Sequence, residues 1–423
     1  MKKLFKTLAV TVALTTMAAG CSSNSASTSG ATGGKVTLSL YSTVTNESDQ
    51  KTMTDIIQKF EKANPNIIIK YNYPAGQYEG ILRVKMAAND MPDLFDTHGW
   101  AKKRYGNYVE DLSKMDWVKD LDPAMKPILE DSKGKVYAFP LNQAKDGITY
   151  NATLLKKYGI QPPTTFDEFM TALQEIKKKS NGQVTPLWFA GSDKSQIAQY
   201  FDQFLTPLLT TDKTHDYSQQ LTNGNFDWSK YTYLTEKFKE MKDQGLLNAD
   251  VLTAQVQQLP QLMAQNKIAF IMAGSALGPT VKKLNPTIQL GTMPMPVIYK
   301  GDQPVWIGGE RFTMAVWKDS KHKPEAEKFI EFLAQPDIVK EFSEGTASPA
   351  GLTNSNPQIY FSSDYAKYKD NRVEPYFDRL YLPSGMWDVM GSTGQQLVAG
   401  TLTPDQASQK MGEEFKRLSS QKK

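Results

Sequence analysis

The side chains that carry out most enzyme chemistry are present in this sequence, but none of them stands in a catalytic motif. A serine nucleophile needs the spacing G-x-S-x-G, and in Gly274–Gly278 the serine stands one position too early. Neither a phosphate-binding loop nor a G-x-G-x-x-G pattern occurs, so no nucleotide cofactor is expected. The three histidines, His98, His215 and His322, lie far apart without HExxH or Cys–His spacing, so no metal site is expected. One catalytic alternative stays open, a hydrolase with two carboxylates, because sequence does not give the separation of its Asp and Glu side chains.

The only cysteine, Cys21, stands at the end of a secretory leader. Lysines at positions 2, 3 and 6 precede an apolar run, Leu8–Met17, that is too short to span a membrane, and the small residues 18–20 follow. Small-small-Gly-Cys resembles a lipobox, whose thiol receives a diacylglycerol, although Ala18 stands where Leu is usual. The Ser/Thr/Gly/Asn-rich stretch 22–34 is typical of a flexible tether, which disfavours the alternative of a buried thiol. We expect a signal peptide over 1–20, a lipidated Cys21 with its tether over 21–34, and attachment to the extracellular face of the cell membrane.

Bulk charge does not select a partner for this chain. The formal net charge is +4 from 49 basic and 45 acidic residues, and it falls to +1 once the three leader lysines are removed. The densest basic run, Lys177–Lys179, is typical of a solvated helix end, so nucleic acid is not an expected partner. About 390 residues follow the tether, enough for two or three domains with ample cores.

The elements that must position any site alternate between strands and helices. Alternating apolar residues predict strands at 36–40 and 67–73, and between them Met53, Ile56, Ile57 and Phe60 form one helical face that ends at Asn64-Pro65. A strand–helix–strand order implies a parallel sheet. Further strands are expected at 134–140, 142–151, 268–272 and 311–317, and helices at 165–179, with a Thr165–Glu168 capping box, and at 323–334. The chain is therefore predicted to be α/β throughout.

Five segments, in the same order along the chain, together resemble the extracellular sugar-binding proteins of ATP-driven (ABC) importers, the family of maltodextrin- and multiple-sugar-binding lipoproteins. The segments are KTMTDIIQKFEKANPNIIIKY (51–71), NDMPDLFDTHGW (89–100), GKVYAFPLNQAKDGITYNATLLKKYGIQPPTTFDEF (134–169), IAFIMAGSALG (268–278) and IGGERFTMAVWKDSKHKPEAEKFIEFLAQPDIVKEF (307–342). Each is a soft pattern alone, but five in order span almost all of the chain after the tether.

The resemblance implies a two-lobed, periplasmic-binding-protein-like fold with a three-crossing hinge. From the positions of the motifs, the crossings are expected near 143–147, 306–312 and 345–351. Lobe one is then 35–143 plus 312–347, and lobe two is 144–306 plus 352–423. The resemblance also implies an oligosaccharide ligand in the interlobe cleft, delivery to the transmembrane permease subunits of an ABC importer, no enzyme activity, and a monomer.

A sugar offers an apolar face of C–H groups and a rim of hydroxyls, so its site needs aromatic surfaces beside Asp, Glu, Asn, Gln or Arg. Loops that follow strand ends are where α/β sheets place ligands. The candidates in such loops and at the expected crossings are Asn46, Glu47, Asp96, His98, Trp100, Asn142, Gln143, Asp193, Ser275, Trp306, Gly309, Glu310, Arg311, Tyr381 and Trp387.

Several of these candidates have an equally ordinary structural reading. Asn46 and Glu47 could cap the following helix, Asn142 and Gln143 could hold the hinge, and the adjacent Glu310 and Arg311 could form a pair across it. Ala276 also stands where many members of the family carry a Trp after Gly-Ser, which removes one expected aromatic wall. We therefore expect sugar as the class of ligand, whereas its identity, linkage and length are not readable from the sequence.

Overall fold

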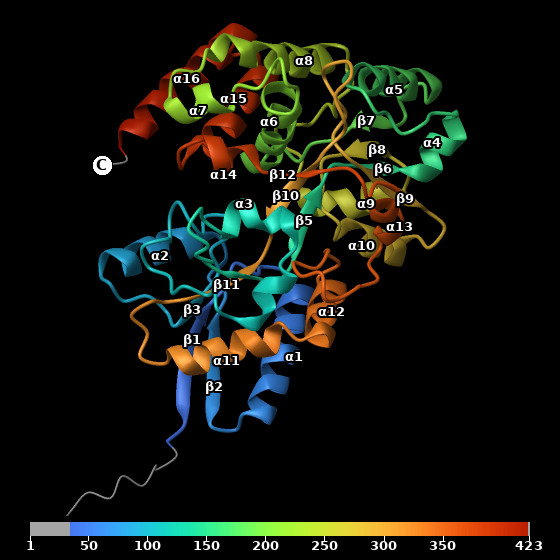
Figure 1. The fold of residues 1–423 in the computed structure, drawn as a ribbon. Helices are drawn as coiled ribbons and strands as arrows, with labels where there is room; N and C mark the ends of the chain where they lie inside the picture. Colours follow the sequence, from blue (N-terminus) through green and yellow to red (C-terminus); the bar gives the residue numbers. More distant parts are fainter. Residues whose placement is uncertain (1–33, 422–423) are drawn as a thin grey trace, which may run out of the picture. The chain divides into compact units, whose positions relative to one another are not determined.

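A computed structural model describes residues 34–421, and the chain from Lys35 onward forms one compact unit. The signal peptide, Cys21 and nearly all of the tether expected from the sequence lie outside the described residues. Within the described part, one apolar core defines the first lobe and two apolar cores lie in the second. A small sheet joins the two lobes (Figure 1).

The first lobe is built on the strand–helix–strand unit that opens the described chain. Strands β1 (Val36–Tyr41) and β2 (Ile67–Asn72) pair in parallel, and α1 (Glu47–Ala63) connects them. The Asn46 side chain caps α1, and the predicted apolar face of that helix is buried, with Phe60 packed edge-on against Phe329 of α11 (Lys323–Leu333). The sheet order is β2-β1-β3-β11-β4, and the remaining elements of this lobe are α2 (Tyr78–Ala87), β3 (Leu94–Phe95), α3 (Lys126–Leu129), β4 (Phe139–Pro140), β11 (Thr313–Val316) and α12 (Pro336–Gly345).

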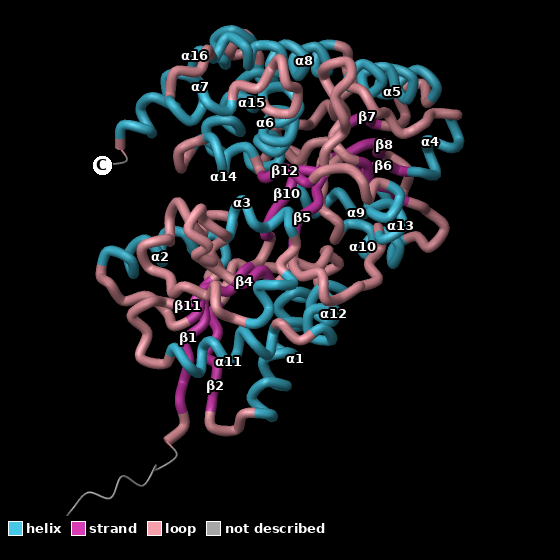
Figure 2. The backbone as a smooth tube through the Cα atoms, in the orientation of Figure 1, coloured by secondary structure: helices cyan, strands magenta, loops and turns pink. Residues whose placement is uncertain are grey.

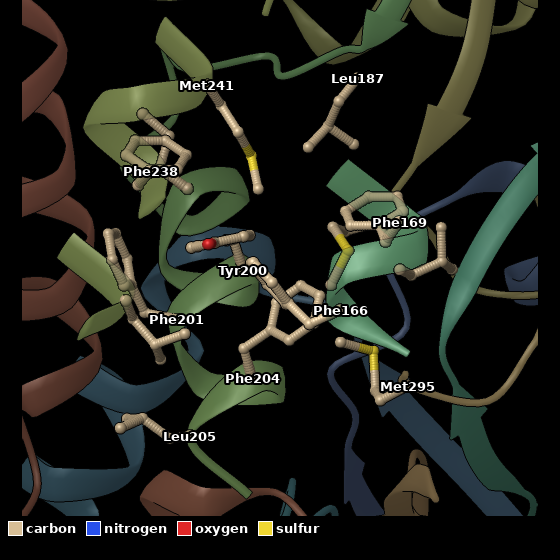
Figure 3. Close-up of a cluster of buried hydrophobic side chains, with 14 of the residues drawn as sticks. Phe166, Phe169, Leu187, Tyr200, Phe201, Phe204, Leu205, Phe238, Met241 and Met295 are labelled. Carbon is tan, nitrogen blue, oxygen red and sulfur yellow. The ribbon is translucent and has the colours of Figure 1, made fainter. Parts of the chain in front are cut away.

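The second lobe is larger and mostly helical, and its core is rich in aromatic side chains (Figure 3). Its sheet has the order β7-β8-β6-β9. Helix α6 (Lys194–Leu209) runs through the centre of this core, with 12 of its 16 residues buried. The other elements are β6 (Ile148–Asn151), α4 (Ala152–Tyr158), α5 (Phe166–Lys179), β7 (Thr185–Leu187), α7 (Ser218–Asn223), α8 (Thr232–Asp243), α9 (Leu259–Ala264), β8 (Ile268–Ile271), α10 (Leu277–Leu284), β9 (Leu290–Met293), α13 (Ser362–Lys367), α14 (Phe377–Tyr381), α15 (Met386–Ala399) and α16 (Pro404–Ser420).

A three-stranded sheet lies where the chain passes between the lobes (Figures 1 and 2). Its central strand β10 (Trp306–Glu310) pairs antiparallel with β5 (Gln143–Asp146) and parallel with β12 (Val373–Pro375). The strands approach so closely that a Cβ on Gly308 would lie 1.9 Å from the carbonyl oxygen of Ala144. The chain leaves the core of the first lobe after Leu352 and enters the cores of the second at Phe361, between α12 and α13.

Several helices and strands that were predicted from a periodic apolar pattern or a capping box are confirmed. Helix α5 begins at Phe166 behind a complete Thr165–Glu168 capping box, and α11 and β8 lie within two residues of their expected ends. The strand expected over 134–140 is only the two-residue β4, because most of that segment is loop closed by an isolated bridge between Glu130 and Val136. The stretch expected over 142–151 is divided into β5 and β6 at Gly147. No helix in the range 34–421 is both long and apolar enough to cross a membrane.

Candidate ligand-binding cleft

A cavity of about 820 Å³ opens between the lobes, within the size range of small-molecule sites, about 300–1,000 Å³. The first lobe supplies a group of charged side chains and one Trp, and the second lobe supplies both polar and apolar surface. The residues that line it include Glu79, Arg83, His98, Trp100, Arg104, Ala144, Asp146, Gln196, Gln199, Met272, Gly274, Ala276, Arg311, Tyr376, Asp378, Arg379, Ser384, Trp387 and Asp388.

Aromatic rings reach the cavity from both lobes. Trp100 follows a tight turn in which His98 and Gly99 both have positive φ angles, and its backbone amide donates to the carbonyl of Thr97 at 2.9 Å. Trp387 lies in the first turn of α15 and packs partly against the core of the second lobe. Tyr376, just before α14, adds a third ring, which is mostly buried. Flat apolar surfaces therefore face the cavity from both lobes.

The carboxylate of Asp146, at the end of β5, is the acceptor nearest the hinge. The Tyr376 hydroxyl donates to it, and the amide of Gln199 donates to it at 3.3 Å. Burial raises the pKa of Asp146, while these hydrogen bonds and the guanidinium groups of Arg311 and Arg379 act in the opposite direction. The carboxylate is thus fixed in place before any ligand hydroxyl approaches it.

Arg379 and Glu310 form a buried pair beneath the cavity. The Arg379 guanidinium lies 4.1 Å from the centre of the Tyr376 ring, and its Nη1 donates to the backbone carbonyl of Glu310 at 3.0 Å and lies 3.7 Å from Glu310 Oε2. The Glu310 side chain is fully buried, and neither of its carboxylate oxygens has a hydrogen-bond partner. Burial raises the pKa of Glu310 from 4.5 to about 7, and Arg379 only partly offsets this rise.

Four of the residues singled out from the sequence line the cavity. They come from the loop after β3, from the segment between β10 and β11, and from α15: His98, Trp100, Arg311 and Trp387.

The candidates of the first lobe that do not line the cavity hold its loops in place. Asn46 caps α1 by accepting the Asp49 amide at 2.8 Å, and Glu47 is exposed in the first turn of that helix. Asp96 is fully buried and accepts the amides of His98 and Thr313, so it fixes the turn that carries Trp100.

The candidates at the hinge are buried and mostly bonded to neighbouring segments. Asn142 donates to Thr346 and accepts the Phe312 amide at 3.0 Å, and Gln143 donates to Asp122 and to the carbonyl of Ala350. Trp306 is 2% exposed and packs against Tyr365, and Gly309 has a φ of +130° beside the buried Glu310.

The remaining candidates belong to the second lobe. Asp193 caps α6 by accepting the Ser195 amide at 2.9 Å, and Ser275 lies with its hydroxyl 3.5 Å from that of Ser348. Tyr381 packs against Phe377 at the end of α14. Ala276 lines the cavity, so a small side chain stands there in place of the aromatic wall that the family resemblance would supply.

Several polar or charged residues that line the cavity were not predicted from the sequence. In the first lobe, Glu79 lies in α2 and Arg104 lies in the loop after β3. In the second lobe, Gln199 lies in α6, Tyr376 directly precedes α14 and Arg379 lies in α14. Only Asp146 carried a usable signal, because it directly follows Asn142–Lys145 in a segment already assigned to the hinge. Across the described range 34–421, no group of three or more His, Cys, Asp or Glu side chains could hold a metal ion.

Two lobes, a joining sheet of crossing strands and a cleft lined from both sides define a protein that binds a solute between its lobes. The family model for bacterial extracellular solute-binding proteins matches residues 45–340, and the chain belongs to that family. The resemblance noted from the sequence and the two-lobed fold are therefore confirmed, and the chain is a binding protein of the ABC sugar-importer class rather than an enzyme.

Individual relatives extend this result over nearly the whole chain. The melibiose/raffinose/stachyose-binding protein MelE of Bacillus subtilis is 52% identical over 402 residues, which are 95% of this chain and 94% of that protein. A sugar transporter of Bacillus licheniformis, solved in complex with stachyose, is 59% identical with a TM-score of 0.84, covering 90% of this chain and 100% of that chain. A binding protein of Bacillus subtilis solved in an open conformation is 53% identical with a TM-score of 0.88, covering 92% and 98%.

Proposed function

We propose that this chain is a lipid-anchored extracellular receptor that binds an oligosaccharide of the melibiose, raffinose and stachyose type and delivers it to the permease of an ABC importer. The observation that carries the choice of sugar is the 52% identity to MelE over 95% of the chain. The cleft is consistent with it, because the cavity combines two Trp rings with carboxylates, amides and guanidinium groups. Such a mixture suits a ligand with apolar faces and many hydroxyls.

Within the cleft, we assign stacking of sugar rings to Trp100 and Trp387, which approach from opposite lobes. Hydroxyls of the sugar then form hydrogen bonds with the carboxylates of Asp146 and Asp388, the side-chain amide of Gln199 and the guanidinium of Arg379. Asn46, Asn142 and Gln143 support the loops and the hinge from behind, as their hydrogen bonds indicate. The other candidates that do not line the cavity are given no direct contact with the sugar: Glu47, Asp96, Asp193, Ser275, Trp306, Gly309, Glu310 and Tyr381.

We also propose a small change to the lobe boundaries expected from the sequence. The first two crossings stay at 143–147 and 306–312, where β5 and β10 pair. Ala350 and Leu352 still pack in the core of the first lobe, so the third crossing belongs to the segment after Leu352 and before Phe361.

Isothermal titration of the purified protein with stachyose, raffinose and melibiose tests the proposed ligand, with maltotetraose as a control of similar size to stachyose. We expect saturable binding of the first group, weaker or no binding of maltotetraose, and recovery of intact sugar after denaturation. Equal affinity for all four sugars would contradict the assigned specificity. Release of monosaccharides during the incubation would contradict the receptor function itself.

The lipid anchor has a separate test, because it concerns residues outside the described range. In cells, the unaltered chain is expected to partition with the membrane fraction and into detergent, whereas a Cys21→Ser chain is expected in the medium or the soluble fraction. Equal membrane partitioning of both chains would contradict lipidation of Cys21, and it would leave the sugar-binding proposal unaffected.

A further inference from the structure

At one edge of the cleft, a loop of the first lobe touches the second lobe directly. The Arg104 Nη2 atom donates to the Ser384 hydroxyl at 3.0 Å, across 280 positions of sequence. Next to it, the Lys103 ammonium donates to the backbone carbonyl of Leu380. Gly99 of the same loop lies against the Arg379 side chain, where a Cβ would come within 2.3 Å of Nε. The loop that carries Trp100 is thus in contact with the α14–α15 segment that carries Trp387.

Arg104 is the centre of this contact because each part of its guanidinium has a different partner. Nη1 donates to the Glu79 carboxylate, and that carboxylate also accepts the Tyr105 hydroxyl at 3.1 Å. The guanidinium carbon lies 4.6 Å from the centre of the Trp100 ring, a distance typical of cation–π stacking. One face of Trp100 is therefore occupied by Arg104, and only the opposite face is available to a sugar ring.

We infer that Arg104 is a positioning residue that holds the Trp100 ring for its ligand and fastens the two lobes through Ser384 when the cleft closes. This inference rests on the proposed sugar-binding function for its first half, whereas the second half concerns the lobes alone. Both roles depend on the planar, forked shape of the guanidinium, because a lysine cannot bond Glu79 and Ser384 at once while lying flat on an indole ring.

The fastening role is tested by Ser384→Ala, which removes the acceptor in the second lobe and leaves Arg104, Glu79 and Trp100 in place. A hydrogen bond to a charged group in a partly exposed position is expected to slow opening about three- to tenfold. Stopped-flow measurements should therefore show stachyose release about three- to tenfold faster in the variant, with the association rate nearly unchanged. Arg417→Ala, which breaks an exposed pair with Glu414 on α16, is the matched control and should release sugar at the unaltered rate.

The positioning role is tested by Arg104→Lys, alone and combined with Trp100→Ala. If Arg104 acts through the indole ring, the lysine variant weakens stachyose binding about tenfold in the unaltered chain, as lost stacking and a lost charged hydrogen bond would do. In the Trp100→Ala background the same replacement should have a smaller effect, limited to the lost hydrogen bond with Ser384, since the ring that Arg104 positions is gone. An equal effect in both backgrounds overturns this role.

A measurement without sugar separates failure of this inference from failure of the proposed function. In the full chain with Cys21→Ser, spin labels on Lys62→Cys of α1 and Glu236→Cys of α8 report the separation of the lobes, and both positions are exposed. Adding Ser384→Ala should shift the distance distribution towards larger separations. An unchanged distribution together with an unchanged release rate overturns the fastening role, whether or not stachyose proves to be the ligand.

Discussion

Replacing Glu310 by Gln should remove a pH dependence of stability that this one buried carboxyl imposes. Its side chain is fully buried, neither oxygen has a hydrogen-bond partner, and Arg379 lies 3.7 Å away. His98, Lys102 and Asp96 of the first lobe are the other titratable groups that act on it. Gln keeps the shape of the side chain and an oxygen for Arg379, but it carries no ionisable proton.

The size of the effect follows from the pKa of Glu310, which burial raises from 4.5 to about 7. Such a difference corresponds to on the order of 3 kcal/mol of folding free energy. Below pH 4.5 both the folded and the unfolded chain hold the proton. Between pH 4.5 and 7 the unfolded chain releases it and the folded chain keeps it, so stability falls as the pH rises through this window. Above pH 7 both states are ionised, and the loss stays constant.

Urea unfolding at a series of pH values from 5 to 8, followed by circular dichroism, measures this contribution. The free energy of unfolding of Glu310→Gln minus that of the unaltered chain should increase by on the order of 2–3 kcal/mol between pH 5 and pH 7.5, and then level off. Glu236→Gln, on the exposed surface of α8, is the matched control. Parallel pH profiles for Glu310→Gln and the unaltered chain would refute the reasoning that burial keeps this carboxyl protonated.

Trp100→Ala and Trp387→Ala should each weaken sugar binding about tenfold or more in calorimetry, with little change in the urea midpoint, because both rings are only partly buried. Gly309→Ala should lower the free energy of unfolding by about 1–3 kcal/mol, because φ is +130° and the new Cβ would lie 2.2 Å from the Ile128 side chain. Thr165→Ala should cost about 1 kcal/mol, since it removes the side chain that caps α5.

Each of these predictions has a result that contradicts it. Unchanged affinity in both Trp variants would remove the stacking assignment. Gly400→Ala, where φ is +73° with no atom within 4 Å, is the control for Gly309 and should cost only about 1 kcal/mol, so equal losses would show that the contact with Ile128 plays no part. A Thr165→Ala chain with the unaltered urea midpoint would show that the cap contributes nothing to stability.

Helices and strands with a clear apolar period or a capping residue could be predicted from the sequence. Elements that form only through contacts with distant parts of the chain could not. Helix α1 showed one apolar face, and α5 showed its capping box, so local residues were sufficient. Helix α6 was not predicted, because all of its residues from Tyr200 to Leu209 are buried and it contains Pro207, so this part has no exposed polar face to mark its period. The three-residue β12 exists only through its pairing with β10, about 70 positions earlier.

The same distinction applies to the cleft. Trp100 and Trp387 were recognisable because each stands close to Gly or Pro residues, outside any periodic apolar pattern. The segment around Trp387 was expected to be a loop, whereas the structure places this residue in the first turn of α15. Arg379 and Arg104 gave no such signal, since each becomes part of the cavity only when distant segments meet, through Glu310 in one case and Ser384 in the other. The strand order of the hinge, unknown from sequence, also decides that Trp306 and Glu310 are buried.

The narrow gap at Gly308 restricts how this receptor can evolve or be engineered. Any side chain at that position would separate β10 from β5, because the Ala144 carbonyl already fills the space that a methyl group would need. Position 308 of the joining sheet therefore has little freedom to vary. Natural selection for another sugar, or the design of a sugar sensor, would act instead on the loops at the edge of the cleft around Trp100 and Ser384. Substitutions there leave the contact between β10 and β5 intact.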